Sequence, residues 1–180
     1  CHLTAYQDAD LAARHANLVA RAQAAESSQA KGRSGLTEAV ARGYFKLLAI
    51  KDEYEVARLY TDPAFRGRID ATFEGVERLE VMLAPPLISR PDPQTGKLRK
   101  RAYGPWVFSL FRLLARMKGL RGGPWDIFGR CAERLAERAL IKNYEETVAA
   151  LLQGLREDNH ALAVEIAALP EQIRGYGPVK

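Results

Sequence analysis

The chain is 180 residues long, and its 47% hydrophobic and 27% charged residues are ordinary for a globular protein, which argues against disorder. Its net charge of +5 is mildly basic, but no recognised nucleic-acid-binding module accompanies the charge, so nucleic acid is not expected as a partner. No apolar run reaches the roughly 18 residues of a membrane span, so we expect a cytoplasmic protein without membrane contact.

The cysteines and histidines do not predict a metal site. Cys1 and Cys131 are the two cysteines, whereas an iron–sulfur cluster or a structural zinc site typically needs four ligands. His2, His15 and His160 lie far apart and lack metal-ligand spacing. We therefore predict no catalytic, cofactor-binding or metal-binding residue in this chain.

The first 30 residues are rich in alanine. Alanine favours a helix but buries little surface, so we expect one helix over residues 3–28 that is partly exposed or lies against another domain. A flexible break follows at residues 31–35. A second helix is predicted from Thr37 to about Tyr60 because its apolar residues recur at helical spacing.

Asp62 and Pro63 predict the start of a third helix. The Asp side chain can accept from free backbone N–H groups, and Pro at the first helical position loses no hydrogen bond. We expect this short helix to end at Gly75 in a left-handed cap.

In the middle of the chain, the spacing of the apolar residues changes from the helical period to alternation. Leu79, Val81 and Leu83 alternate with more polar residues, and a basic segment over residues 97–103 follows the turn at residues 91–96. This pattern predicts a β-hairpin at about residues 78–103. Two strands are marginal alone in water, so the hairpin should pack on helices.

Helical patterns occupy the rest of the chain. A core helix is predicted to open at residues 104–105, with Trp106, Val107, Leu110, Phe111, Leu114 and Met117 on its apolar face. Asp126 is expected to cap a long helix to about Leu155 whose inward side includes Ile127, Phe128, Cys131 and Leu135, and Asp158 or Asn159 to cap a last helix to Leu169. The expected fold is mainly α, a helical bundle-like domain with one small hairpin.

The first candidate interaction site is an acid, base and aromatic cluster: Lys51, Asp52, Glu53, Tyr54, Glu55 and Arg58. Lys51 and Glu55 are four residues apart, as are Tyr54 and Arg58, so one helical turn can present an ion pair beside a phenol. Clustered carboxylates shift one another's pKa and favour acid–base or anion-binding roles. The structural alternative is a solvated helix face with one buried salt link that holds the Asp62 corner.

The second candidate is a run of cations: Lys97, Arg99, Lys100 and Arg101. Such a run can speed docking of an acidic partner, although charges on an edge strand commonly serve to prevent aggregation. The third candidate is the tail at residues 170–180, which contains Arg174 and two glycines that flank an aromatic. Glycine allows close backbone approach, here to the rest of the fold or to a neighbouring domain. Residues 119–123 superficially suggest a phosphate cradle, but no strand precedes them.

Five ordered blocks resemble one known family: residues 51–65, 83–87, 100–106, 118–122 and 170–175. The family is the C-terminal region of the fused indolepyruvate:ferredoxin oxidoreductases, and the likeness covers nearly the whole chain from Leu3. At Pro178 this sequence departs from the family pattern, which more often has His there.

The resemblance implies what the parent enzyme does. Those enzymes oxidatively decarboxylate 2-oxoacids to acyl-CoA with thiamine diphosphate and iron–sulfur clusters, and they pass the electrons to ferredoxin. That machinery lies upstream in the family, and no catalytic motif of it matches a position here. Because the sequence starts at Cys1 without an initiator Met, we expect residues 1–180 to be a single C-terminal accessory domain cut from a larger polypeptide, with the upstream domains as partners.

Three hypotheses follow from the sequence. The first is an accessory domain that stabilises the assembly or shapes access to its active site or to ferredoxin. The second is an electrostatic docking module for an acidic partner such as ferredoxin. The third is an autonomous enzyme that uses Glu53, Tyr54 and Glu55.

Overall fold

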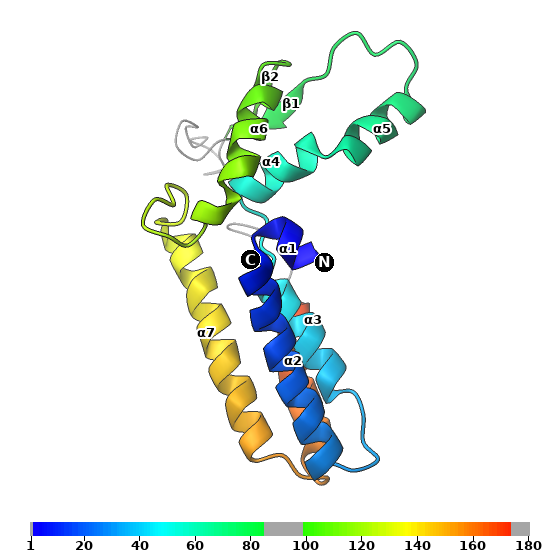
Figure 1. Cartoon of the computed structure of the whole chain (residues 1–180), viewed down its shortest axis with the longest axis vertical. Coiled ribbons are helices and arrows are strands. Elements are labelled where there is room, and N and C mark those ends of the chain that lie inside the picture. Colours follow the sequence, from blue (N-terminus) through cyan, green and yellow to red (C-terminus); the bar gives the residue numbers. More distant parts are fainter. Residues whose placement is uncertain (1, 85–98, 174–180) are drawn as a thin grey trace. The chain divides into compact units, whose positions relative to one another are not determined.

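The computed structural model describes residues 2–84 and 99–173 (Figure 1). Contacts within the chain divide it into two compact units. Unit 1 consists of the segments Cys1–Asp52 and Lys118–Lys180, and unit 2 is the continuous segment Glu53–Met117 between them. The described part of the chain is mainly helical with one small antiparallel sheet, which confirms the predicted fold class. The prediction that the whole chain is a single accessory domain stays a prediction.

Unit 1 is built entirely from helices in its described residues. They are α1 (His2–Tyr6), α2 (Ala9–Gln29), α3 (Leu36–Leu48), η1 (Met117–Leu120), α7 (Ala132–Gln153), α8 (His160–Ala168) and η2 (Leu169–Gln172). Helices α2, α3 and α7 run side by side (Figure 1), and α3 also contacts α8. Helix α3 is therefore the central element of unit 1.

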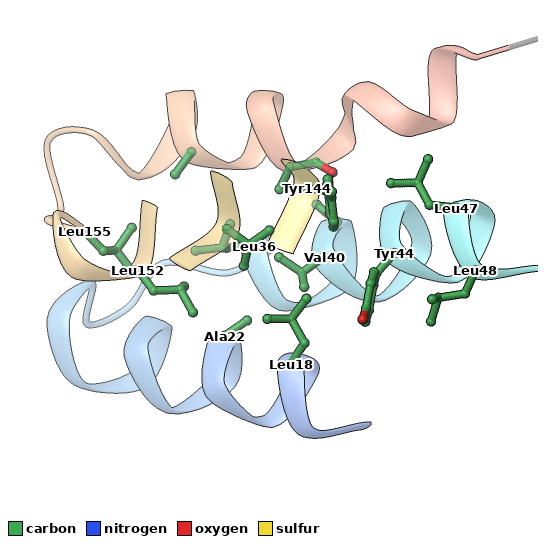
Figure 2. Close-up of a cluster of buried hydrophobic side chains, with 14 of the residues drawn as sticks. Leu18, Ala22, Leu36, Val40, Tyr44, Leu47, Leu48, Tyr144, Leu152 and Leu155 are labelled. Atoms are coloured by element: carbon green, nitrogen blue, oxygen red, sulfur yellow. The ribbon is translucent and has the colours of Figure 1, made fainter. Parts of the chain in front are cut away.

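The core of unit 1 surrounds the apolar stripe of α3. Leu36, Val40 and Tyr44 recur every four residues and are fully buried. Leu18 and Ala22 of α2 face this stripe in Figure 2, and the same cluster contains Tyr144, Val148 and Leu152 of α7 and Ala163 and Ala167 of α8. The alanines of α2 and α8 allow these helices to approach α3 closely.

The single helix predicted over residues 3–28 is wrong, because the chain breaks between α1 and α2. Asp8 has extended backbone, and its carboxylate accepts from the backbone N–H of Leu11 at 2.8 Å. It is thus an N-cap that starts a new helix. The alanine-rich helix α2 buries Leu18, Ala22 and Glu26 inside unit 1. Its predicted contact with another domain remains untested.

The helix predicted from Thr37 to Tyr60 is also divided. Helix α3 ends at Leu48, and α4 of unit 2 begins at Glu53. The intervening residues lack a proline or glycine that would have marked the break. Instead, the break places the carboxylate of Asp52 against a distant arginine, described below.

The start of the long helix was predicted several residues too early. Helix α7 begins at Ala132 with Cys131 as its N-cap, and Cys131 is exposed rather than on an apolar face. Ile127 and Leu135, predicted inward, are also mostly exposed. Asp126 does not cap α7, because its carboxylate binds backbone N–H groups of the preceding loop. Asn159 occupies the N-cap position of α8 but does not cap it with its side chain, which instead accepts from the N–H of Arg156 and donates to the carbonyl of Gly154.

Unit 2 contains α4 (Glu53–Thr61), α5 (Pro63–Thr72), β1 (Val81–Leu83), β2 (Arg101–Tyr103) and α6 (Val107–Arg116). The predicted cap of α5 is confirmed, since the Asp62 carboxylate accepts from the N–H of Ala64 at 2.8 Å. The helix ends at Thr72, before Gly75, which has a φ of +65° but lies beyond the helix.

The hairpin strands are antiparallel, with Val81 opposite Tyr103, and they are shorter than predicted. A small core joins the hairpin to α4 and α6 through Ala57, Val81, Val107 and Phe111. Two other residues of the predicted apolar face of α6, Trp106 and Leu110, are exposed instead, at 61% and 43%. The core helix prediction is therefore only partly correct.

Within the described residues, we find no helix that combines the length and the apolar character needed to cross a bilayer.

Candidate functional site

The first predicted cluster is divided between the two units. Lys51 and Asp52 belong to unit 1, whereas Glu53, Tyr54, Glu55 and Arg58 lie on α4 of unit 2. Because α4 starts at Glu53, Lys51 is not on the helical turn that the four-residue spacing assumed. The backbone carbonyl of Lys51 accepts from Arg134 at 3.4 Å.

On α4, Arg58 pairs with the carboxylate of Glu55, which is nearly buried. The two hydrogen bonds are 2.8 and 2.7 Å long, and the guanidinium also lies 4.0 Å from Asp62. The carboxylates of Glu55 and Asp62 raise the pKa of Arg58, although burial opposes them. This is the salt link near the Asp62 corner that the structural alternative predicted. It holds α4 against the start of α5.

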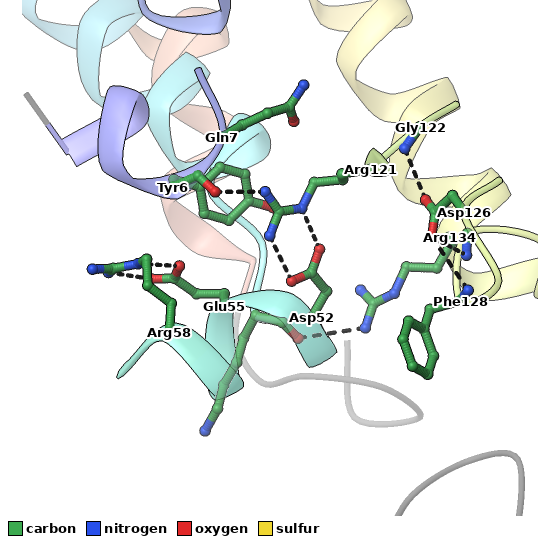
Figure 3. Close-up of polar contacts among 12 residues, drawn as sticks. Tyr6, Gln7, Asp52, Glu55, Arg58, Arg121, Gly122, Asp126, Phe128 and Arg134 are labelled. Carbon is green, nitrogen blue, oxygen red and sulfur yellow. Dashed lines mark hydrogen bonds and ion pairs between the residues drawn. The ribbon is translucent and has the colours of Figure 1, made fainter. Parts of the chain in front are cut away.

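Asp52 makes a deeply buried ion pair in unit 1. Its carboxylate accepts two hydrogen bonds from Arg121, at 2.5 and 2.9 Å, and the two side chains are only 5% and 9% exposed. Figure 3 shows the guanidinium and the carboxylate facing each other. A bidentate pair fixes both the distance and the plane of its partners. It therefore joins residue 52, where the chain leaves unit 1, to the segment where it returns.

The same segment binds the C-terminal end of α1. Lys118 donates to the carbonyls of Thr4 and Ala5, and Arg121 donates to the carbonyl of Tyr6 at 2.7 Å. These carbonyls have no helical partner at the end of a helix, and cations there also suit the helix dipole. The Arg121 guanidinium lies 3.8 Å from the centre of the Tyr6 ring (Figure 3), which adds a cation–π contact.

A second buried carboxylate, Asp126, organises the loop before α7. It accepts from the backbone N–H groups of Gly122, Phe128 and Gly129, and from Arg138 at 2.9 Å. A Cβ at Gly129 would lie 2.2 Å from both the Asp126 carboxylate and the Arg138 guanidinium, so a larger residue would have to displace this ion pair. In the loop at residues 119–123 that resembled a phosphate cradle, the N–H of Gly122 thus binds Asp126, and those of Arg121 and Gly123 bind the backbone carbonyls of Lys118 and Leu120.

Glu26 of α2 caps the N-terminus of another helix, α3. Its carboxylate accepts from the N–H groups of Leu36 and Thr37 at the start of α3, from the Thr37 hydroxyl, and from His160 at 2.8 Å. Burial alone would raise the pKa of Glu26, but these hydrogen bonds outweigh burial and lower the pKa to about 2. The N-cap residue of α3, Gly35, has no side chain to do this.

A third cluster of polar side chains connects α2, α3 and α7. Arg14 donates two hydrogen bonds to Glu145, which also accepts from the Tyr44 hydroxyl. Burial and the neighbouring Glu145 raise the pKa of Tyr44, while the bonds from Arg14 and Tyr44 lower the pKa of Glu145 against the effect of burial. Tyr144 donates to the carbonyl of Ala167 at 2.8 Å, and burial raises the pKa of its phenol. Both phenols therefore act as hydrogen-bond donors.

The second predicted cluster is exposed. Arg101 lies on β2 opposite Leu83, and Arg99 and Lys100 precede it with exposed side chains. Lys97 and Arg174, from the second and third candidates, lie outside the described residues. Three of the four predicted hairpin cations thus form one exposed basic segment of unit 2.

Sequence reasoning missed the partners of the buried carboxylates. Lys118 and Arg121 lie in one of the five blocks that carry the family resemblance, but no sequence pattern linked them to Asp52 or to α1. Glu26 and His160 belong to no motif. The paired residues are 69 and 134 positions apart in the sequence, and local sequence patterns carry no information about such distant pairs. In the described ranges, no three His, Cys, Asp or Glu side chains gather as metal ligands. Whether the chain binds a cofactor stays a prediction.

A protein-family model described as "Family of unknown function (DUF6537)" matches residues 1–180. No curated protein and no solved structure matches the chain.

Proposed function

The chain belongs to the Family of unknown function (DUF6537), and we propose that it is a helical accessory domain of a 2-oxoacid:ferredoxin oxidoreductase of the indolepyruvate type. On this proposal the parent enzyme carries thiamine diphosphate and iron–sulfur clusters in upstream domains and acts in the cytoplasm. This chain contributes no catalytic residue and holds the assembly together. Its partners are the upstream domains and ferredoxin.

One observation carries the structural side of this proposal. Asp52 and Arg121 come from two of the blocks that resemble the oxidoreductase family, and they form a nearly buried bidentate pair. Lys118, in the same block as Arg121, binds carbonyls of α1. The characteristic charges of these blocks thus hold chain segments together, which suits a scaffold better than a catalytic centre.

The test begins with the reading frame that encodes the chain. We expect thiamine-binding and cysteine-cluster motifs upstream of residue 1 in the same polypeptide. That polypeptide, purified whole, should reduce ferredoxin in the presence of an arylpyruvate and coenzyme A. Turnover of a 2-oxoacid by residues 1–180 alone, or a frame without those motifs, would contradict the proposal.

The role of the domain is tested in the whole polypeptide. Truncation before Leu3 should impair assembly, stability or turnover. Asp52→Ala should lower the unfolding temperature while the folded fraction keeps its KM for the 2-oxoacid. Asp70→Ala is the matched control, because Asp70 forms an exposed pair with Arg66. If the truncated enzyme assembles, unfolds and turns over like the intact one, the accessory role is wrong.

A second candidate function is electrostatic docking of an acidic partner such as ferredoxin. The exposed cations Arg99, Lys100 and Arg101 favour it. Binding of purified ferredoxin to the full chain should weaken as ionic strength rises and should fall when these three residues become Gln. The control exchanges Arg66 and Arg68 of α5 for Gln. Binding that ignores both salt and the triple exchange would exclude this function.

A further inference from the structure

Helix α6 has an exposed apolar stripe on the side opposite the core of unit 2. Trp106, Leu110 and Leu113 are 61%, 43% and 56% exposed, whereas Val107 and Phe111 are buried. Spacings of four and three residues place the three exposed side chains on one side of the helix. An apolar stripe that remains in water on an otherwise packed helix is typical of a binding surface.

Cations border this stripe. Arg112 and Arg116 are exposed on α6. Arg101 on β2, and Arg99 and Lys100 just before that strand, are exposed as well. The rings of Tyr103 and Trp106 meet edge to face at 5.8 Å, so the hairpin and the stripe are continuous. The sequence has no Asp or Glu between Asp92 and Asp126, a stretch with eight Lys and Arg residues. This stretch of the chain is therefore both apolar and basic, and the exposed Glu80 near it is paired with Arg78.

We propose that this surface of α6 and β2 binds an acidic amphipathic helix of a partner protein. Leucines on one face of such a helix would cover Trp106, Leu110 and Leu113, and Asp or Glu residues beside them would meet the flanking arginines. Trp and Arg are the residues most enriched at energetic centres of interfaces. The inference deepens the second candidate function, since it names the surface and the chemistry of the acidic partner.

The surface fits a protein helix better than nucleic acid or a bilayer. Leu110 and Leu113 offer nothing to a phosphate backbone, whose binding is chiefly electrostatic. A helix that lies in a bilayer buries a broad apolar face, whereas the broad face of α6 already packs on Val81 and Ala57 in the core of unit 2. The exposed stripe of Trp106, Leu110 and Leu113 is a single row along α6, which suits a single helix.

The experiment measures binding to the full chain by fluorescence anisotropy. The probe is a fluorescein-labelled helical peptide with leucines on one face and glutamates beside them. A peptide of the same composition with scrambled order, a duplex oligonucleotide of equal net charge, and phosphatidylglycerol vesicles (followed by co-sedimentation) are the comparisons. We expect the amphipathic peptide to bind at least about tenfold more tightly than the scrambled one.

Variants then test the surface itself. Leu110→Ser with Leu113→Ser should weaken binding of the amphipathic peptide about tenfold or more, and Arg112→Gln with Arg116→Gln should weaken it and reduce its salt dependence. Leu162→Ser is the control, because Leu162 is 58% exposed on α8 of unit 1. All these side chains are exposed, so the circular dichroism spectrum should not change.

Several outcomes would overturn the inference. They are equal binding of the two peptides, tighter binding of the oligonucleotide or the vesicles, no binding of any probe, or leucine variants that bind like the wild type. If the triple exchange at residues 99–101 abolishes binding while the leucine variant does not, electrostatic docking stands and the helix-binding surface fails. The two proposals are thereby distinguished.

Discussion

The two units of the chain bury their side chains in different ways. Among the described residues, the core cluster of unit 1 contains sixteen buried residues, and that of unit 2 contains four. Helix α5 of unit 2 buries none. Since regions with few buried contacts open at low free energy, unit 2 should exchange its amide hydrogens faster than unit 1.

The two units also differ in their buried charged side chains. Unit 1 contains the buried carboxylates of Glu26, Asp52, Asp126 and Glu137, and unit 2 contains that of Glu55. A buried charge is tolerated only when it is paired and hydrogen-bonded. In unit 1, Asp52 and Glu26 bind side chains 69 and 134 residues away. Asp126 and Glu137 of unit 1, like Glu55 of unit 2, bind groups 2 to 12 residues away. The comparison teaches that two buried carboxylates of unit 1 connect segments far apart in sequence.

The largest effect should follow removal of the Asp52 carboxylate. Asp52→Ala leaves the buried Arg121 guanidinium without its counterion and should lower the free energy of unfolding by about 3–5 kcal/mol. Urea denaturation followed by circular dichroism measures the change. Asp70→Ala, which breaks an exposed pair, should cost less than about 1 kcal/mol. Equal losses in the two variants would mean that the buried pair does not hold unit 1 together.

The next effect concerns Glu26 and depends on pH. Its pKa is about 2 in the folded chain against an ordinary 4.5, so its stabilisation is present above pH 4.5 and is lost as the pH falls toward 2. The shift corresponds to at most about 3 kcal/mol. The difference in unfolding free energy between wild type and Glu26→Gln should shrink over this range. A difference that stays constant from pH 7 to pH 2 would refute the capping role.

A smaller effect tests the close approach of helices in unit 1. A Cβ at Gly43 of α3 would lie 2.7 Å from the carbonyl oxygen of Ala167 and 2.7 Å from the hydroxyl of Tyr144. Gly43→Ala should therefore cost about 1–3 kcal/mol through overpacking, despite the better helix propensity of alanine. Thermal unfolding checks this. A variant as stable as the wild type would show that α3 and α8 are not packed tightly here.

The smallest effect has the opposite sign and lies in unit 2. Gly67 is inside α5, and a Cβ there would meet nothing within 4 Å. Gly67→Ala should stabilise α5 by about 0.5–1 kcal/mol through helix propensity alone. Hydrogen exchange of the α5 amides should slow accordingly. If exchange does not change, α5 is held by something other than its local propensity.

The predictable parts of the fold are those that neighbouring residues decide. The Asp62 cap, the hairpin and the mainly helical class follow from propensity, spacing and turn chemistry, which short segments contain. The ends of α3 and the start of α7 do not, because Asp52 and Asp126 bind groups brought to them by folding. An aspartate before an apolar run looks the same in sequence whether it caps a helix or holds a loop.

In the candidate site, too, the features decided by neighbouring residues were predictable and those that depend on distant residues were not. The sequence cluster at residues 51–58 identified charged residues that form ion pairs, but it assigned them to one helical turn. Arg121 could not be paired with Asp52 from the sequence, since 69 residues separate them. The run of hairpin cations was found from the sequence because neighbouring residues alone define it, and both roles considered for it, docking and protection of an edge strand, require exposed side chains. Trp106 and Leu110 of the α6 stripe were predicted as core, because periodicity cannot tell which of two apolar faces is covered.

Unit 2 is inserted in the sequence between the two segments of unit 1, so unit 2 is the guest domain and unit 1 is its host. The hydrogen bonds of Asp52, Lys118 and Arg121 described above have both partners inside the host. A polypeptide in which a short glycine-rich linker replaces the guest would therefore retain both partners of each of these bonds.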